Sequence, residues 1–498
     1  MKNTKSIFCI ISILMLGLST PGQSQTYSEW LTSTNKRIEE VRKAPFQVKV
    51  VDSKGQPVKN ADIQVLMTRH AFEFGSAFKV AYINDPQQEA YNQKIIELFN
   101  SGTFENALKV KAWSGDFGEN MAPDATIKAL NWTHSNRIKI RGHLMTGNGL
   151  RNSSKAFIKI HDAEGKGALV RAVMGAIDDK ATQTKFAIDE WDVVNHPVGR
   201  IRPGREAEGA GQARGNQVFG IEESIAWFEQ TRKNLPDGNL YLNESGILSS
   251  PENDSTQIQK YFKWIDHVNA SGLLDGIGLQ SHFRGYPDIQ TVEGKLDKIA
   301  SRGLPIRITE FTADGSDEDK QGEFTRNFMT LCFSHPSVVG IQFWGFWEGN
   351  IFRPPTALFR EDWSEKPNGT VYRELVFNEW WTKEHGKTDK NGSFTTSAFF
   401  GEYDMAYGGW DIEGEPYAKK DDTEFDWYRS RMLGGRTNHW GRISLRFGPK
   451  DFKSKDYDGL GENWPISYED IKPYYDKLDK MVGVYGTKEN MFNEPDGF

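Results

Sequence analysis

Glu310 is the residue in this sequence whose setting is best suited to catalysis. Residues 306–311 read IRITEF, in which alternating apolar residues carry a single carboxylate, and the polar run ADGSDEDKQ comes shortly after. This pattern predicts a buried strand with Glu310 at its carboxyl end. In a barrel of parallel strands that end faces the active site. Considered alone, Glu310 can equally be a surface carboxylate that pairs with an arginine.

Polar side chains recur at the ends of other strand-like stretches. They are Glu105, Asn106, Lys109, Arg141, His143, Trp191, Asp192, Asn195, Asn243, Gln280, His282, Trp344 and Trp347. Carboxylates, amides, imidazoles and indoles that converge on one mouth suit a neutral ligand rich in hydroxyl groups. A phosphate ligand would call for more basic residues or a glycine-rich cradle. The 15 tryptophans and the 12% aromatic content also suit sugar rings, although many aromatics will be ordinary core.

The elements that must position these side chains alternate in type along the chain. The eight strand-like stretches are 72–78, 103–108, 138–145, 189–195, 240–243, 276–283, 305–311 and 339–346, with helical spacing of apolar residues between them. This order predicts an α/β fold, a (β/α)8 TIM barrel. A doubly wound sheet is disfavoured, because no glycine-rich phosphate turn follows the first strand.

Composition limits the class of protein. The 498 residues carry a net charge of -7, which argues against a nucleic-acid surface. Residues 1–25 have a basic start, an apolar run and a polar exit, and we read them as a signal peptide of a secreted or periplasmic protein. No later apolar run approaches the roughly 18 residues of a spanning helix, so no membrane span is expected in the mature chain. Its single cysteine, Cys332, allows no internal disulfide.

The motifs at the strand ends resemble glycoside hydrolase family 10, the retaining endo-β-1,4-xylanases, over residues from about 72 to 381. The matching pieces are ENALK, RGH, WDVVN, GLQSH, TEF and FWGFWEG, in this order along the chain. The resemblance implies a secreted hydrolase whose partner is β-1,4-xylan or xylo-oligosaccharides. It implies neither a cofactor nor a metal.

The resemblance also implies roles for individual residues. Glu310 would be the nucleophile, and Gln280 and His282 would orient it or bind the adjacent sugar. Asn195 would contact the 2-hydroxyl group and Trp344 would form the floor under the scissile sugar. The xylose units on the non-reducing side would be bound by Glu105, Asn106, Lys109 and His143.

Two departures from the family pattern bear on catalysis. The general acid/base expected after WDVVN is replaced by His196, and the tryptophan and histidine usual after the third strand are replaced by Gly147 and Asn148. An imidazolium can act as acid and then as base, but it is a cation beside a developing oxocarbenium ion. The alternative is therefore a catalytically impaired protein that binds xylan. Glu206 or Glu208, in the glycine-rich insertion after His196, could substitute as the acid, although solvated loop charges are the simpler interpretation.

The segments that flank the barrel suggest two further units. Residues 45–68 and 386–405 resemble the halves of a small split β-sandwich of the carboxypeptidase-regulatory or transthyretin type, with the barrel domain, 70–383, inserted between them. Residues 406–498 resemble a truncated piece of a glucose-methanol-choline FAD oxidoreductase, in which Gly434, Gly435, Thr437, Asn438 and His439 would lie against the flavin. No flavin function is expected, because the dinucleotide-binding turn that should precede this piece is absent.

Overall fold

The computed structural model describes residues 26–147, 153–198, 218–250, 256–407 and 445–484. The predicted signal peptide, Asn148, Glu206, Glu208 and the predicted flavin-contacting residues lie outside these ranges. The chain forms two compact units, one of residues 1–48, 65–384 and 395–405, and the other of residues 49–64, 385–394 and 406–498.

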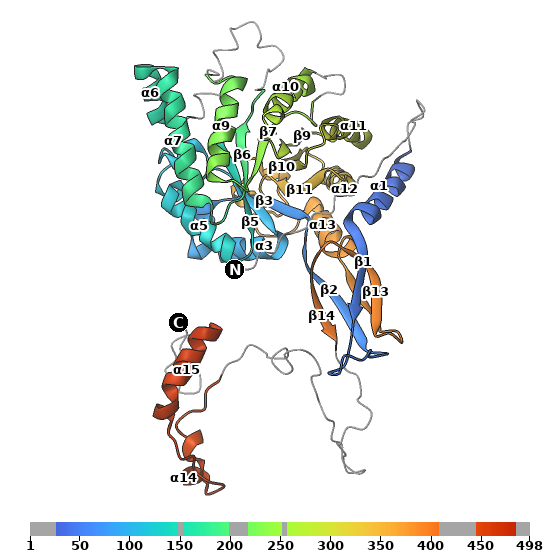
Figure 1. Ribbon diagram of the computed structural model, residues 1–498, viewed down its shortest axis with the longest axis vertical. Coiled ribbons are helices and arrows are strands. Elements are labelled where there is room, and N and C mark those ends of the chain that lie inside the picture. The colour runs from blue at the N-terminus through green and yellow to red at the C-terminus, as the bar shows by residue number, and fades with distance from the viewer. Residues whose placement is uncertain (1–25, 148–152, 199–217, 251–255, 408–444, 485–498) are drawn as a thin grey trace. The chain divides into compact units, whose positions relative to one another are not determined.

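A closed barrel of parallel strands lies at the centre of the first unit (Figure 1). The strand order is β11-β3-β4-β5-β6-β7-β8-β10-β9, and β11 also pairs with β10, which closes the barrel. The bounds are β3 (Glu73–Phe78), β4 (Ser101–Phe104), β5 (Lys139–Gly147), β6 (Glu190–Asn195), β7 (Asn239–Glu244), β8 (Gly276–Leu279), β9 (His282–Arg284), β10 (Ile306–Asp314) and β11 (Val338–Phe343). The predicted (β/α)8 fold is therefore confirmed.

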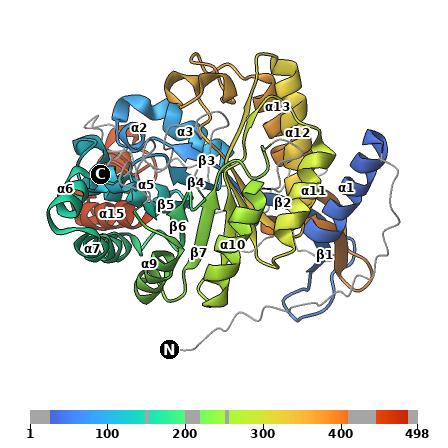
Figure 2. The same ribbon diagram turned by 90° about the horizontal axis from the view of Figure 1, so that it is seen from above.

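Helices surround the strands, as the view in Figure 2 shows. They are α2 (Val80–Ile83), α3 (Glu89–Leu98), α4 (Val110–Trp113), α5 (Pro123–Ser135), α6 (Lys155–Glu164), α7 (Lys166–Thr184), α9 (Ile221–Asn234), α10 (Thr256–Ala270), α11 (Ile289–Ala300), α12 (Glu318–Ser334) and α13 (Pro367–Glu374), preceded by α1 (Tyr27–Arg42). Side-chain caps fix where several begin; Asp317, for example, accepts a hydrogen bond from the Lys320 amide at the start of α12. None of the helices in the described ranges combines the length and apolar content needed to cross a bilayer.

Several predicted strands differ in extent from those observed. The strand that carries Glu310 runs on to Asp314, so Glu310 is not its last residue as predicted, and the stretch 339–346 is a strand only as far as Phe343. The stretch 103–108 is a strand only as far as Phe104, and Glu105–Leu108 form a turn that leads into α4. This turn brings Glu105 and Asn106 out of the sheet at the mouth of the barrel. The stretch 276–283 is interrupted at Gln280 and Ser281, where Ser281 has a φ of 60° that no β-strand residue adopts.

The interior of the barrel below the mouth contains a buried network of opposite charges. Glu190 on β6 accepts hydrogen bonds from Arg141 Nε at 2.6 Å and from Arg307 Nη2 at 2.8 Å. Arg141 also binds Asp192, and Arg307 Nη1 lies 2.9 Å from Glu73. Burial would raise the pKa of Glu190, but the charges of Arg307, Arg141 and Lys139 lower it well below its ordinary value. These side chains join four barrel strands beneath the predicted site.

Strands from the two flanking segments pair with each other. Two small sheets have the orders β1-β13 and β12-β2-β14. Their strands are β1 (Lys43–Lys49), β2 (Asp62–His70), β12 (Lys383–Lys387), β13 (Ser393–Phe399) and β14 (Gly401–Tyr407). The domain boundaries given above remain predictions, as does the oxidoreductase resemblance. The described part of residues 406–498 contains α14 (Ser454–Asp458) and α15 (Tyr468–Val482).

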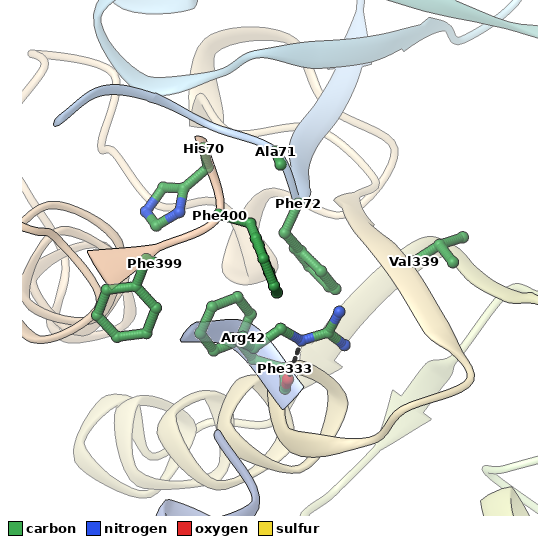
Figure 3. A pocket seen from close by; sticks show the side chains of 8 residues that line it. All are labelled: Arg42, His70, Ala71, Phe72, Phe333, Val339, Phe399 and Phe400. Atoms are coloured by element: carbon green, nitrogen blue, oxygen red, sulfur yellow. Dashed lines mark hydrogen bonds between the residues drawn. The ribbon is translucent and has the colours of Figure 1, made fainter. Parts of the chain in front are cut away.

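A cavity of about 270 Å³ lies at the amino-terminal end of the barrel strands (Figure 3). Phe72, directly before β3, and Val339, near the start of β11, are among the residues that line it. The Arg42 side chain beside it donates to the carbonyl groups of Phe333, His335 and Val338 at 2.6 to 2.9 Å. This cavity is at the opposite end of the barrel from Glu310, and Arg42 ties the helix α1 to the loop before β11.

Candidate active site

The Glu310 carboxylate is buried at the mouth of the barrel and is held by side chains from β7 and β9. Its Oε1 accepts a hydrogen bond from Asn243 Nδ2 at 3.1 Å, and its Oε2 lies 3.1 Å from His282 Nε2. His143 Nε2 lies 4.0 Å from Oε1. Only 5% of Glu310 is exposed, so its orientation is fixed by these contacts.

The electrostatic environment keeps Glu310 ionised. Burial would raise its pKa, but the hydrogen bond from His282 and the charges of His143, His282 and His196 outweigh burial and lower the pKa from its ordinary 4.5 to about 2. A buried carboxylate that stays ionised and points into a mouth can act as a nucleophile or as a base. It is poorly suited to donate a proton.

A second layer of polar side chains fixes the partners of Glu310. Asp192 accepts from His143 Nδ1 at 2.8 Å and from Asn243 Nδ2 at 3.3 Å, so it orients the two groups that face Glu310. Thr309 donates to Asn243 Oδ1 at 2.8 Å, which fixes the direction of that amide. Asp192 is in turn anchored by Arg141. The charged network in the barrel interior therefore reaches up to the site.

His196 directly follows β6 and lies against the end of β7. Its backbone N–H donates to the Asn243 carbonyl at 2.9 Å, and its φ of 55° lies in the left-handed region that non-glycine residues rarely adopt. Its Nε2 lies 3.4 Å from the Gln280 side-chain nitrogen, which also donates to Asn195 Oδ1 at 2.9 Å. Its Nδ1 lies 3.4 Å from Glu244 Oε1. Gln280 contacts both His196 and Asn195, so the three predicted residues lie in one site.

The remaining predicted residues meet around Trp344. The His143 and His282 rings lie nearly perpendicular to the Trp344 ring, with ring centroids 5.3 and 6.4 Å from its own. Lys109 Nζ lies 5.8 Å from the ring centroid and donates to Asn106 Oδ1 at 3.0 Å. Burial lowers the pKa of the Lys109 ammonium, although Glu310 and Glu105 oppose the shift.

Three residues at the site were not predicted from the sequence. Lys79 pairs with Glu105. Thr312 lies 3.0 Å from His282 Nδ1, on the far side of the ring from Glu310, and the fully buried Glu244 pairs with His196. Glu244 directly follows Asn243, so extending that strand by one residue would have found it. Nothing in the sequence distinguishes Lys79 or Thr312 from other polar residues near strand ends.

Among the residues that the structure describes, no three His, Cys, Asp or Glu side chains are grouped so that they could hold a metal ion.

A family model described as glycosyl hydrolase family 10 matches residues 63–374, more than half of the chain. The chain belongs to glycosyl hydrolase family 10. The resemblance found in the sequence is thereby confirmed, and the match includes Glu310, His196 and the other predicted site residues.

Individual curated proteins match over about three quarters of this chain. Endo-1,4-beta-xylanase 3 of Arabidopsis thaliana is 25% identical over 373 residues, which cover 74% of this chain and 46% of that protein. Anti-sigma-I factor RsgI6 of Acetivibrio thermocellus is 30% identical over 390 residues, covering 77% of this chain and 47% of that protein. The chain therefore spans just under half the length of these two curated relatives.

Solved structures support the fold. The structure of xylanase 10B from Thermotoga petrophila in complex with xylobiose has a TM-score of 0.52 at 23% identity, covering 62% of this chain and 95% of that chain. The native xylanase 10B from Thermotoga maritima matches with the same TM-score.

Proposed function

We propose that this family 10 protein is an exported, retaining endo-β-1,4-xylanase-like hydrolase, with Glu310 as nucleophile and His196 in place of the acid/base carboxylate. One observation carries the proposal: Glu310 is buried, ionised and oriented by Asn243 and by His282, whose ring packs against Trp344. Retaining hydrolysis needs such a carboxylate on one side of the scissile bond. Export rests on the signal-like pattern of residues 1–25.

In this proposal the other site residues bind the sugar. Glu105, Asn106, Lys109 and His143 offer charged and amide groups to hydroxyls on the non-reducing side, Asn195 and Gln280 serve the sugar beside the scissile bond, and Trp344 provides an apolar floor. The structurally similar xylanase 10B from Thermotoga petrophila was solved in complex with xylobiose, which supports the substrate class.

An aryl xylobioside with a good leaving group tests the proposal. Dinitrophenolate departs with little acid assistance, so dinitrophenyl xylobioside should give a rapid burst of dinitrophenolate even if His196 is a poor acid. The burst should equal the enzyme concentration, because one phenolate leaves for each glycosyl-enzyme formed. Binding of xylo-oligosaccharides without a burst or turnover would contradict the proposal.

His196→Glu should raise hydrolysis of unmodified xylan. A carboxylic acid next to the nucleophile restores the pair of carboxyl groups that retaining hydrolysis uses, and general acid catalysis contributes roughly 10²–10⁴-fold. We expect a gain of at least about tenfold in reducing-sugar release, with little change in the dinitrophenyl burst. His196→Gln is the matched control: it preserves the approximate size of the side chain, supplies no acid, and should not increase xylan hydrolysis.

The burst should persist into acidic solution. The pKa of Glu310 is lowered to about 2, so the nucleophile stays ionised at every pH well above this value. For dinitrophenyl xylobioside, kcat/KM for the burst should stay level as pH falls from 7 to about 4. An acid limb centred near 4.5, the ordinary value for a glutamate, would show that His282 and His143 do not stabilise the carboxylate. Circular dichroism at each pH would check that the protein remains folded.

A second candidate is a xylan-binding protein without turnover. Two observations favour it: His196 occupies the acid/base position, and one relative is named as an anti-sigma-I factor rather than as a hydrolase. The two candidates share the same cleft and substrate. The burst experiment separates them, because a binding protein releases no dinitrophenolate.

A further inference from the structure

Glu244 is a buried carboxylate in the site that the family pattern of catalytic residues does not use. It ends β7, directly after Asn243, and its exposed fraction is 0%. Its Oε2 accepts a hydrogen bond from the Val198 N–H at 2.7 Å, and its Oε1 accepts one from the Ser245 N–H at 2.7 Å. These two backbone N–H groups hold the Glu244 carboxyl group in one orientation behind the mouth of the barrel.

The basic side chain that faces this carboxyl group is His196. Its Nδ1 lies 3.4 Å from Glu244 Oε1 and 3.4 Å from Ser245 Oγ. Its Nε2 faces the other way, toward the Gln280 amide, and 41% of the side chain is exposed. The imidazole thus stands between a buried carboxylate and the open mouth. A proton on Nδ1 would point at Glu244, which leaves Nε2 to exchange protons on the side of the substrate.

We propose that Glu244 is the positioning residue for His196, and that the pair replaces the single acid/base carboxylate of a retaining hydrolase. This inference rests on the proposed function. Glu244 holds the Nδ1–H tautomer and compensates the positive charge that His196 carries when it is the acid. Compensation matters because an isolated imidazolium would repel the oxocarbenium-like transition state, whereas a His–Glu pair adds no net charge.

In this pair, His196 donates a proton in the first half-reaction and takes one back in the second. In the first, a Glu310 oxygen bonds to the anomeric carbon and the bond from that carbon to the leaving oxygen breaks. The leaving oxygen keeps the electron pair and takes the proton from His196 Nε2, so the imidazolium becomes neutral. In the second, a water oxygen bonds to the anomeric carbon, the electron pair of the ester bond returns to Glu310, and a water proton moves to Nε2. The Nδ1 proton stays on His196 throughout.

The backbone of residues 196–198 also holds His196 next to Glu244. His196 holds a positive φ, and its N–H is bound by the carbonyl of Asn243, the residue before Glu244. Val198, two residues after His196, donates its N–H to Glu244. Hydrogen bonds from the backbone N–H groups of His196 and Val198 therefore fix this segment to the end of β7. This binding also offers a purely structural explanation for Glu244, which the experiment must separate from the proposed one.

The experiment compares Glu244→Gln with the wild type on two substrates. Phenyl xylobioside needs acid assistance for its poor leaving group, and dinitrophenyl xylobioside does not. If Glu244 acts through His196, kcat/KM should fall about 100-fold on phenyl xylobioside and less than about threefold in the dinitrophenyl burst. Glu293→Gln is the matched control. Its carboxylate accepts hydrogen bonds from Trp30 and Arg37 outside the barrel, and both rates should be unchanged.

A double-mutant cycle provides the second arm. In the His196→Glu background the acid is a carboxylic acid, so Glu244→Gln should no longer slow phenyl xylobioside hydrolysis. Nitrogen NMR should show a protonated Nδ1 for His196 in the wild type, and the Nδ1–H signal should shift or broaden in Glu244→Gln. This readout does not depend on turnover.

The outcomes separate the two proposals. Equal losses on both substrates, or the same loss in both backgrounds, would overturn the role of Glu244 and leave Glu310 as nucleophile. A wild type that gives neither a burst of dinitrophenolate nor turnover of dinitrophenyl xylobioside would overturn the proposed hydrolase. An NMR spectrum with Nδ1 of His196 unprotonated would overturn the pair itself, whatever the rates.

Discussion

Glu310→Ala should abolish the burst and lower turnover of dinitrophenyl xylobioside by on the order of 10⁵-fold, because the variant lacks the carboxylate that forms the glycosyl-enzyme. The substitution removes a side chain that is 5% exposed and held by Asn243 and His282, so the cleft gains a small space where the carboxylate stood. Stopped-flow absorbance at the dinitrophenolate band measures the loss. Circular dichroism would show whether the variant remains folded.

Azide offers a sharper test of the same role. A small anion can enter the space left by Glu310→Ala and attack the anomeric carbon from the side the carboxylate occupied. The product should be a xylobiosyl azide with inverted configuration, identified by proton NMR. Glu105→Ala is the matched control, since this carboxylate is assigned to sugar binding; azide should not rescue it. Azide rescue of Glu105→Ala but not of Glu310→Ala would reverse the assignment.

Glu190→Gln should give the largest loss of stability among the site-supporting residues. The change removes the negative charge that compensates Arg141 and Arg307 in the barrel interior, where both arginines are 2% exposed. Breaking a buried ion pair on one side typically costs about 3–5 kcal/mol, because the remaining charge is left desolvated. Urea unfolding followed by tryptophan fluorescence would measure the loss.

The loss of unfolding free energy caused by Glu190→Gln should also depend on pH. The pKa of Glu190 is lowered in the folded protein, so its ionised form contributes stability above its ordinary value of 4.5, and this contribution fades as pH falls below that value. The difference between Glu190→Gln and the wild type should therefore shrink in acid. Glu379→Gln is the control: it breaks an exposed pair with Arg326, which keeps Glu374 as a partner, and should cost about 1 kcal/mol or less. Equal costs for the two variants would contradict the buried-network interpretation.

The sequence by itself determined the type and order of the barrel elements. Alternating strand and helix patterns identified all eight barrel positions, because the periods 2.0 and 3.6 are local properties of a chain that must bury one face. It also pointed to Glu310 as a candidate, since a lone carboxylate in an apolar strand is visible without knowing its neighbours, although the strand continues to Asp314. The substitution at His196 was visible for the same reason, as a change of one residue within a recognisable motif.

Only the tertiary structure decided which groups surround these two residues. The pKa of Glu310 depends on His143 and His282, which come from strands 167 and 28 positions away in sequence (310 − 143 and 310 − 282). The pairing of Glu244 with His196 joins two strand ends whose contact depends on barrel closure and on the positive φ of His196. Charge, burial and hydrogen bonding act through space over a few ångströms, so a sequence pattern identifies the residues but not their partners.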